Sequence, residues 1–199
     1  MRVLIICLII SCIYTLKAQN QKDFNLSVST DIGYSSLKLN GHKNNMSTQG
    51  AGIEIGYNLN YVIIESGIFY NRSQTNYISK GESAFLEIQN LKIPLGFMTV
   101  IGVGTQKNDE KPKNIGLLLG LGIYSDYYFK IKADNLFRES NVGWNLGMYS
   151  KFGIHLKVNQ IWGFNLGIKN ENGFGEAKKD ALKIKNERTT MFLCFEIYL

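Results

Sequence analysis

Proline, cysteine and long apolar runs are all scarce in this sequence. Its 199 residues include two Pro and three Cys, and two of the cysteines lie within the first twelve residues. Beyond residue 18, no apolar run is long enough to cross a bilayer as a helix. A chain that is 45% hydrophobic and lacks such runs is too polar for a helical membrane protein. Its length suits a single domain.

The one continuous apolar stretch lies at the N-terminus and predicts an export signal. A short positive start precedes an apolar run over residues 3–13, and Ala18 places a small residue before a cleavage point at Gln19. The run is too short to span a bilayer as a helix. We therefore expect residues 1–18 to be a signal peptide and residues 19–199 to form one domain. A buried N-terminal helix is the alternative.

Signal cleavage would also remove two of the three cysteines. Cys194 would then stand alone, so the exported chain could form no internal disulfide. No CxxC pair or Cys/His cluster suited to a metal would survive either. Residues 9–12, Ile-Ile-Ser-Cys, loosely resemble a lipoprotein cleavage box, and processing there stays open as a second route.

An excess of charge of one sign is also missing. The formal charge is +6, and removal of Arg2 and Lys17 with the signal leaves 20 basic against 16 acidic residues, or +4. The Lys and Arg residues are scattered, and no stretch interleaves them with aromatic residues along one face. Nucleic-acid binding is therefore not expected.

The chain is instead rich in Gly, Tyr and Phe and alternates strictly between apolar and other residues in eight separate rows. A period of two predicts a β-strand. Together the rows predict an all-β protein. Taking every second residue, they run from Phe24 to Tyr34, Ala51 to Leu59, Val62 to Tyr70, Leu91 to Phe97, Ile115 to Ile123, Val142 to Ile154, Trp162 to Ile168 and Met191 to Leu199.

None of these eight rows contains a charged residue, whereas the opposite strand faces carry several. An Arg or Lys that faces lipid near the membrane midplane costs roughly 2–4 kcal/mol. We therefore expect the rows to face lipid and the charges to face a lumen, with Glu65 and Lys92 pairing across neighbouring strands and Cys194 as a small inward hydrophobe. The expected lumen polar cluster consists of Asp31, Glu54, Glu65, Lys92, Lys151, Arg188 and Glu196.

The predicted fold is an eight-stranded antiparallel up-and-down transmembrane β-barrel, closed by pairing the last strand with the first. Short turns near Asn60 and Asn159 alternate with longer connections, as in bacterial outer-membrane barrels with short periplasmic turns and long external loops. The segment from Gly104 to Lys113 would be an unusually long periplasmic turn. We expect external loops near residues 36–49, 72–84, 128–140 and 171–187.

Aromatic residues are expected to form a girdle at each membrane interface. Tyr34, Tyr70, Tyr127 and Trp144 would lie near the external ends, and Tyr57, Phe97 and Trp162 near the periplasmic ends. A soluble ligand-binding barrel would also alternate, but its apolar rows would face inward and its exterior would be charged. That alternative is kept for comparison.

Three segments, residues 56–59, 65–70 and 90–97, resemble the PorT-like outer-membrane β-barrel family. They read Gly-Tyr-Asn-Leu, Glu-Ser-Gly-Ile-Phe-Tyr and Asn-Leu-Lys-Ile-Pro-Leu-Gly-Phe. Leaders in that family frequently end in Ala-Gln, as Ala18 and Gln19 do here. The resemblance implies the barrel and its location, and one family member is tied to a protein secretion system. Pro94, on an inward position, predicts a bulge or weak pairing.

No constellation for catalysis stands out, and we expect no enzyme activity and no cofactor or metal. A rim enzyme acting on lipid or lipopolysaccharide is the alternative, with His42 near Ser35, Ser36 and Ser47 as its candidate group. Eight strands enclose a lumen that side chains can fill, which favours a closed barrel over a channel. The expected partners are outer-membrane lipids, the barrel-assembly machinery during insertion and, at the external loops, lipopolysaccharide or a protein.

Overall fold

The structure is a computed structural model. It describes residues 24–39, 42–59, 61–79, 82–102, 115–133, 143–174, 177–179 and 182–199. Side chains are described for residues 24–36, 45–59, 61–76, 85–102, 115–132, 143–174 and 186–199. The expected signal peptide and the expected long turn from Gly104 to Lys113 lie outside these ranges.

Eight long antiparallel strands form the wall, and one short strand extends it. In chain order they are β1 (Phe24–Leu39), β2 (His42–Leu59), β3 (Val62–Ser79), β4 (Glu82–Gly102), β5 (Ile115–Ala133), β6 (Gly143–Lys157), β7 (Trp162–Gly173), the short β8 (Ala177–Lys179) and β9 (Leu182–Tyr198). Within the described residues, no helix has the length and hydrophobicity to cross a bilayer.

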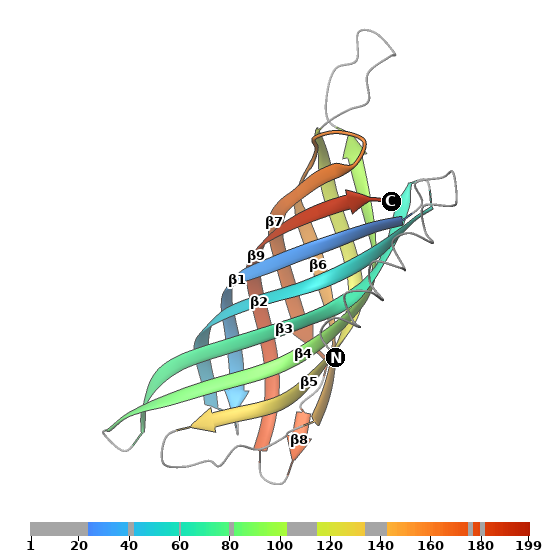
Figure 1. The fold of residues 1–199 in the computed structure, drawn as a ribbon. Coiled ribbons are helices and arrows are strands. Elements are labelled where there is room, and N and C mark those ends of the chain that lie inside the picture. Colours follow the sequence, from blue (N-terminus) through green and yellow to red (C-terminus); the bar gives the residue numbers. More distant parts are fainter. Residues whose placement is uncertain are drawn as a thin grey trace, which may run out of the picture.

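The sheet closes on itself. Neighbouring strands pair in the order β1 to β7 and then β9, and β9 pairs back with β1 from Asn25↔Tyr198 to Leu39↔Ile184. Closure leaves no unpaired edge among the long strands, as a bilayer requires. Figure 1 shows the strands strongly tilted around the barrel, with the start of β1 beside the end of β9. We call this the terminal end, and the opposite end, where β1 joins β2 and β3 joins β4, the hairpin end.

The apolar rows face outward. Ile32, Ile68, Leu121 and Met191 are all more than half exposed, while the charged residues between the rows are buried. Within the described residues, no charge lies on an outward position among the apolar rows. The predicted barrel is confirmed, and the soluble alternative, which needs the opposite orientation, is wrong.

Three of the four segments expected as long external loops, residues 36–49, 72–84 and 171–187, are largely strand, and the fourth is strand as far as Ala133, where its described part ends. β1 continues to Leu39 and β2 begins at His42, and β3 and β4 likewise continue to Ser79 and from Glu82. The alternation of apolar and polar residues ends there, because residues beyond the lipid need no apolar face. The hydrogen bonds between neighbouring strands continue. The barrel therefore extends past its apolar belt at the hairpin end.

Two turns at the terminal end are tight, one of them as expected near Asn159. The Asn159 side-chain oxygen accepts hydrogen bonds from the backbone N–H groups of Ile161 at 2.7 Å and Trp162 at 2.8 Å. This is an Asx turn, which an Asn side chain closes at little cost. At the other tight turn, the Tyr61 amide donates to the Leu59 carbonyl at 2.8 Å.

Pro94 weakens the β3–β4 ladder, as its missing N–H predicts. The register runs continuously to Ser66↔Leu95 and resumes at Phe69↔Lys92, so the two positions between are unpaired. The Ser66 hydroxyl donates to the Pro94 carbonyl at 2.8 Å and bridges part of this gap. A β-bulge lies elsewhere, in the pairing of β4 with β5, where the register shifts between Gln89 and Asn90 and β5 has one extra residue.

Candidate functional site

Charged side chains fill the middle of the lumen. Six of them share one connected set of ion pairs, which we call the central network, and all are buried. They come from five strands, β1, β4, β5, β7 and β9, and their formal charges cancel, with three cations and three carboxylates. The members are Asp31, Lys92, Asp126, Lys169, Glu171 and Arg188.

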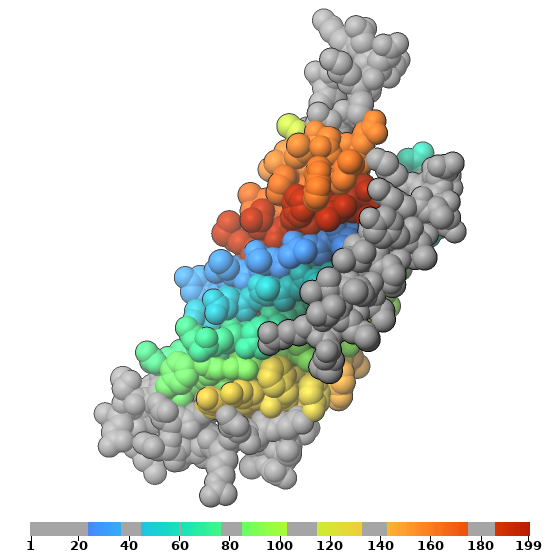
Figure 2. All heavy atoms as spheres, in the orientation of Figure 1, coloured from blue at the N-terminus to red at the C-terminus, as the bar shows by residue number. Residues whose placement is uncertain are grey.

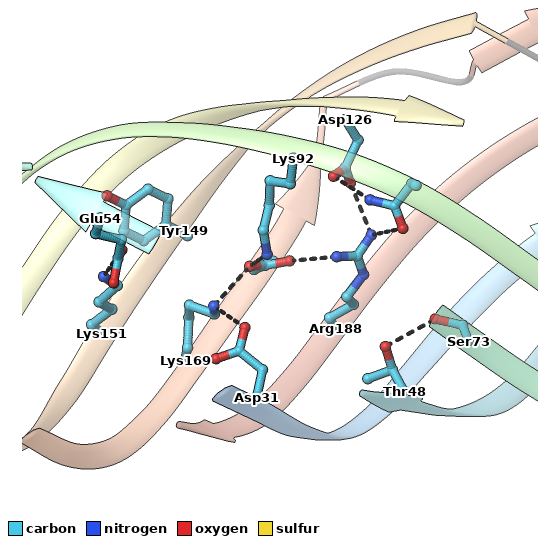
Figure 3. A network of polar contacts seen from close by, with 12 residues as sticks. Asp31, Thr48, Glu54, Ser73, Lys92, Asp126, Tyr149, Lys151, Lys169 and Arg188 are labelled. Carbon is cyan, nitrogen blue, oxygen red and sulfur yellow. Dashed lines mark hydrogen bonds and ion pairs between the residues drawn. The ribbon is translucent and has the colours of Figure 1, made fainter. Parts of the chain in front are cut away.

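Glu171 is the hub of the central network. Its carboxylate pairs with Lys92, lies 3.5 Å from the Lys169 ammonium and accepts from the Arg188 guanidinium at 3.3 Å. Lys169 in turn pairs with Asp31. Figure 3 shows these side chains converging from opposite walls of the barrel. Each charge taken out of water is thus met by an opposite charge, which is the condition for tolerating buried ions.

Arg188 and Asp126 form the second half of the central network. The Arg188 guanidinium lies 2.9 Å from an Asp126 carboxylate oxygen and also donates to the Asn90 side-chain carbonyl at 3.2 Å. The Asn90 amide donates to Asp126 at 2.6 Å. An aromatic ring completes the surroundings, since the ammonium groups of Lys92 and Lys169 lie 5.3 Å and 4.8 Å from the Phe69 centroid.

A second cluster lies nearer the terminal end and is centred on Lys151. Its ammonium is 2.8 Å from a Glu54 oxygen and 2.7 Å from a Glu65 oxygen. The Tyr149 hydroxyl donates to Glu65 at 2.9 Å, and the Ser29 hydroxyl donates to Glu54 at 2.8 Å. One cation therefore serves two carboxylates, which themselves take further hydrogen bonds.

A third cluster lies at the terminal mouth of the lumen. The Tyr198 hydroxyl donates to a Glu196 oxygen at 3.0 Å and lies 3.2 Å from His155 Nε2. The other ring nitrogen, Nδ1, is 2.7 Å from the Asn165 side-chain oxygen and 3.6 Å from Glu196. The Asn165 oxygen would accept a hydrogen bond from Nδ1 in the tautomer that carries its proton there.

Apolar side chains fill the lumen between and beyond these clusters. Toward the terminal end, Met98, Leu118, Phe192 and Cys194 pack together with Ile63 against them. The cavity beside them measures about 20 Å³, room for about one water. Toward the hairpin end the lumen holds five further buried apolar side chains, Met46, Leu86, Ile88, Tyr128 and Ile131. In the part of the chain that the structure describes, the lumen is filled.

The seven residues of the expected lumen cluster all lie buried at inward positions, but they fall into the three separate groups. The expected pairing of Glu65 with Lys92 is wrong. Their strands are neighbours, but the register places Glu65 opposite Gly96, four residues along from Lys92. Glu65 pairs with Lys151 and Lys92 pairs with Glu171 instead.

Three members of the central network were missing from the expected cluster. Asp126 of β5 and Lys169 of β7 lie an even number of residues from the other inward positions of their strands, and Glu171 follows two residues after Lys169. Glu171 had been assigned to an external loop. Counting in steps of two beyond the last apolar residue of each row would have placed all three in the lumen.

The candidate catalytic group His42 lies at the first residue of β2, opposite Leu39 at the hairpin end. Its side chain is outside the described range. Among the residues that are described, no group of three or more His, Cys, Asp or Glu side chains is placed to hold a metal ion.

A closed antiparallel barrel that is apolar outside and charged inside defines the class of transmembrane β-barrels found in bacterial outer membranes. The sequence agrees, since the model of the family described as outer membrane protein beta-barrel domain matches residues 3–189. This chain belongs to that family. It is an outer-membrane protein.

Solved structures support the same fold. The chain is similar to the neisserial surface protein A, with a TM-score of 0.56 and 12% identity over 89% of this chain and 97% of that one. It is also similar to the outer membrane protein OprG from Pseudomonas aeruginosa, with a TM-score of 0.53 and 14% identity over 87% and 94% of the two chains. At these identities the likeness shows the fold alone. No significantly similar sequence was found among curated proteins.

Proposed function

We propose that this chain is a structural or binding protein of the outer membrane that acts through its hairpin end, with a closed lumen and no catalytic role. The observation that carries the proposal is the filled lumen. Three polar clusters and the apolar side chains between them occupy the interior, and the central network joins opposite walls by ion pairs. Among the described residues, this packing leaves solutes no continuous water-filled path through the barrel.

The hairpin end is the part of the barrel best suited to binding. Its strands extend beyond the apolar belt and are polar there. Binding residues commonly lie on segments that a rigid scaffold holds in place. A hollow of about 320 Å³ lies in this region, between Ser36 and Asn45 on one side and Asn172 and Glu187 on the other. We infer that this end faces the cell exterior, where a protein partner or lipopolysaccharide would meet it.

We further propose how the chain is processed and which subfamily it belongs to. Residues 1–18 would be a signal peptide, removed before the barrel-assembly machinery inserts residues 19–199. Within its family the chain would be PorT-like, on the strength of residues 56–59, 65–70 and 90–97. N-terminal sequencing of the protein from purified outer membranes should begin at Gln19; a sequence beginning at Cys12 would establish lipoprotein processing instead.

Labelling in intact cells tests the role of the hairpin end. In a Cys194→Ser background, Gln74→Cys places a thiol at the hairpin end and Asn58→Cys places one at the terminal end. A membrane-impermeant maleimide should label the first variant and leave the second unlabelled until the cells are lysed. The reverse result would overturn the orientation, and with it the proposed binding surface.

Solute permeation tests the closed lumen separately. Liposomes that contain the protein should swell in arabinose no faster than protein-free liposomes, whereas a general porin supplies the positive control. Rapid swelling would contradict the proposal. The rim-enzyme alternative predicts that His42→Ala changes the lipid or lipopolysaccharide profile of the membrane, and the proposal predicts an unchanged profile.

A further inference from the structure

The outer wall changes from apolar to basic just above the lipid belt on β3, β4 and β5. On β3 the last aromatic outward residue is Tyr70, and the next outward position is Arg72. The register sets Arg72 opposite Gln89 of β4, and Gln89 opposite Lys130 of β5. A polar row with two cations therefore crosses three neighbouring strands directly above Tyr70, on the side toward the hairpin end.

The bulge between β4 and β5 is what turns the lysines outward. Asn90 faces Tyr128, but the next pair is Gln89↔Lys130, so β5 has one extra residue, Phe129. Beyond it Ile131 is buried and Lys132 is exposed. If β5 had no bulge and Phe129 were paired in regular alternation from outward Tyr127, both lysines would face inward. Bulges are features that re-aim side chains, and this one places Lys130 and Lys132 on the outer surface.

Glu87 positions the neighbouring groups. Its carboxylate pairs with the Arg72 guanidinium at 2.5 Å and accepts from the Gln89 side-chain amide at 2.5 Å, and Lys132 lies opposite it in the register. The Glu87 side chain is only 8% exposed, whereas that of Arg72 is 39% exposed. Arg72, Lys130 and Lys132 against Glu87 give this basic patch a net charge of +2.

An apolar groove of about 900 Å³ begins immediately below the basic patch. Ala51, Gly52, Ser66 and Gly67 are small residues that leave it hollow, and larger outward side chains line its sides. The strands that form it, β1 to β4, run side by side as slanting bands in Figure 2. At its upper end are Tyr70 and Leu91, each two residues from a member of the polar row.

We propose that the basic patch and the groove together bind a phosphorylated glycolipid of the outer leaflet, with its phosphates on Arg72, Lys130 and Lys132 and one acyl chain in the groove. The charge of the patch suits phosphate, and its height just above an aromatic residue of the belt is that of lipid headgroups. The groove continues from that height into the hydrocarbon region. This site rests on the proposed orientation of the hairpin end toward the cell exterior, but it lies on the lipid-facing wall and does not depend on what the hairpin end binds.

Lipid binding to the purified, folded barrel in detergent tests the patch. The probes are bis-phosphorylated lipid A and the same lipid with both phosphates removed, with binding measured by native mass spectrometry. Lys130→Gln/Lys132→Gln should weaken binding of the phosphorylated lipid roughly 25-fold, at about fivefold for each lysine near the headgroups. Lys157→Gln, which removes a cation at the terminal end, is the matched control and should bind like the parent.

A second pair of variants tests the groove. Ala51→Phe should fill it and weaken the binding of lipid A while leaving the barrel folded, as judged by heat-modifiable migration. Ser150→Phe places the same ring on an outward position of β6, outside the groove, and should bind normally. Equal binding of the phosphorylated and dephosphorylated lipids, or parental binding by the double lysine variant, would overturn the proposal.

Discussion

Lys151 lies between the carboxylates of Glu54 and Glu65, and within the described residues the ion pairs of both carboxylates are with this lysine. Lys92 is in a different position, because its partner Glu171 also contacts Lys169 and Arg188. Removing one partner of a buried ion pair costs most when no other opposite charge lies near the charge that remains. The two lysines should therefore differ in their contribution to stability.

Lys151→Met should lower the free energy of unfolding by about 3–5 kcal/mol, because it leaves two buried carboxylates without a cation. The measurement is urea-induced unfolding of the barrel in lipid vesicles, followed by tryptophan fluorescence. Adding Glu54→Gln and Glu65→Gln removes the stranded charges and should recover most of the loss. Equal stability of the single and triple variants would show that Lys151 acts through packing and not through its charge.

Lys92→Met should lower the free energy of unfolding by a smaller amount, about 1–3 kcal/mol, because two cations still compensate Glu171. Lys157→Met, at the end of β6, serves as the control and should leave the free energy of unfolding within about 0.5 kcal/mol of the parent. The same vesicle assay measures both. If Lys92→Met were as stable as the parent, the central network would not contribute to the stability of the barrel.

Glycines on neighbouring strands make room for the tyrosines of the lumen. A methyl group added at Gly122 of β5 would lie 2.6 Å from the Tyr149 ring, and one at Gly96 of β4 would lie 2.1 Å from its hydroxyl. A methyl group added at Gly147 of β6 would likewise lie 2.4 Å from the Tyr124 ring. These inward glycines of β4, β5 and β6 thus allow each tyrosine to lie across the adjacent strand.

Gly122→Val should displace Tyr149 from this position and break its hydrogen bond to Glu65. We expect a loss of about 1–3 kcal/mol in the free energy of unfolding, typical of overpacking. Gly120→Ala is the control on the same strand, since its nearest neighbour is the Lys151 Cβ at 3.3 Å. Combining Gly122→Val with Tyr149→Ala should restore part of the loss, and a fully additive double variant would contradict the contact.

At the scale of strands, the sequence was sufficient within the eight apolar rows to decide which residues face lipid and which face the lumen. A period of two places Asp31, Glu54 and Lys151 inward without any knowledge of their partners. It could not supply the partners, because the offset between strands, which separates Glu65 from Lys92, is a property of the closed sheet. It also could not show where strands end beyond the lipid, since alternation stops there and hydrogen bonding does not.

The whole molecule combines two surfaces of opposite character on one sheet. The outer surface is apolar between the two tryptophans, Trp144 near the hairpin end and Trp162 near the terminal end. The inner surface holds the central network and the Lys151 cluster, and the apolar side chains between them close the lumen. Membrane insertion, closure and the absence of charge from the outer rows are thus consequences of one pattern, repeated on eight strands.

Quenching of single tryptophans by brominated lipids tests this orientation most directly. In a background without Trp144 and Trp162, a tryptophan at outward Leu121 should be quenched strongly by lipids brominated deep in the acyl chain, and one at inward Phe192 should not. Each variant is first shown to be folded by heat-modifiable migration. Strong quenching at position 192 together with weak quenching at position 121 would contradict the account, because the charged face would then meet the lipid.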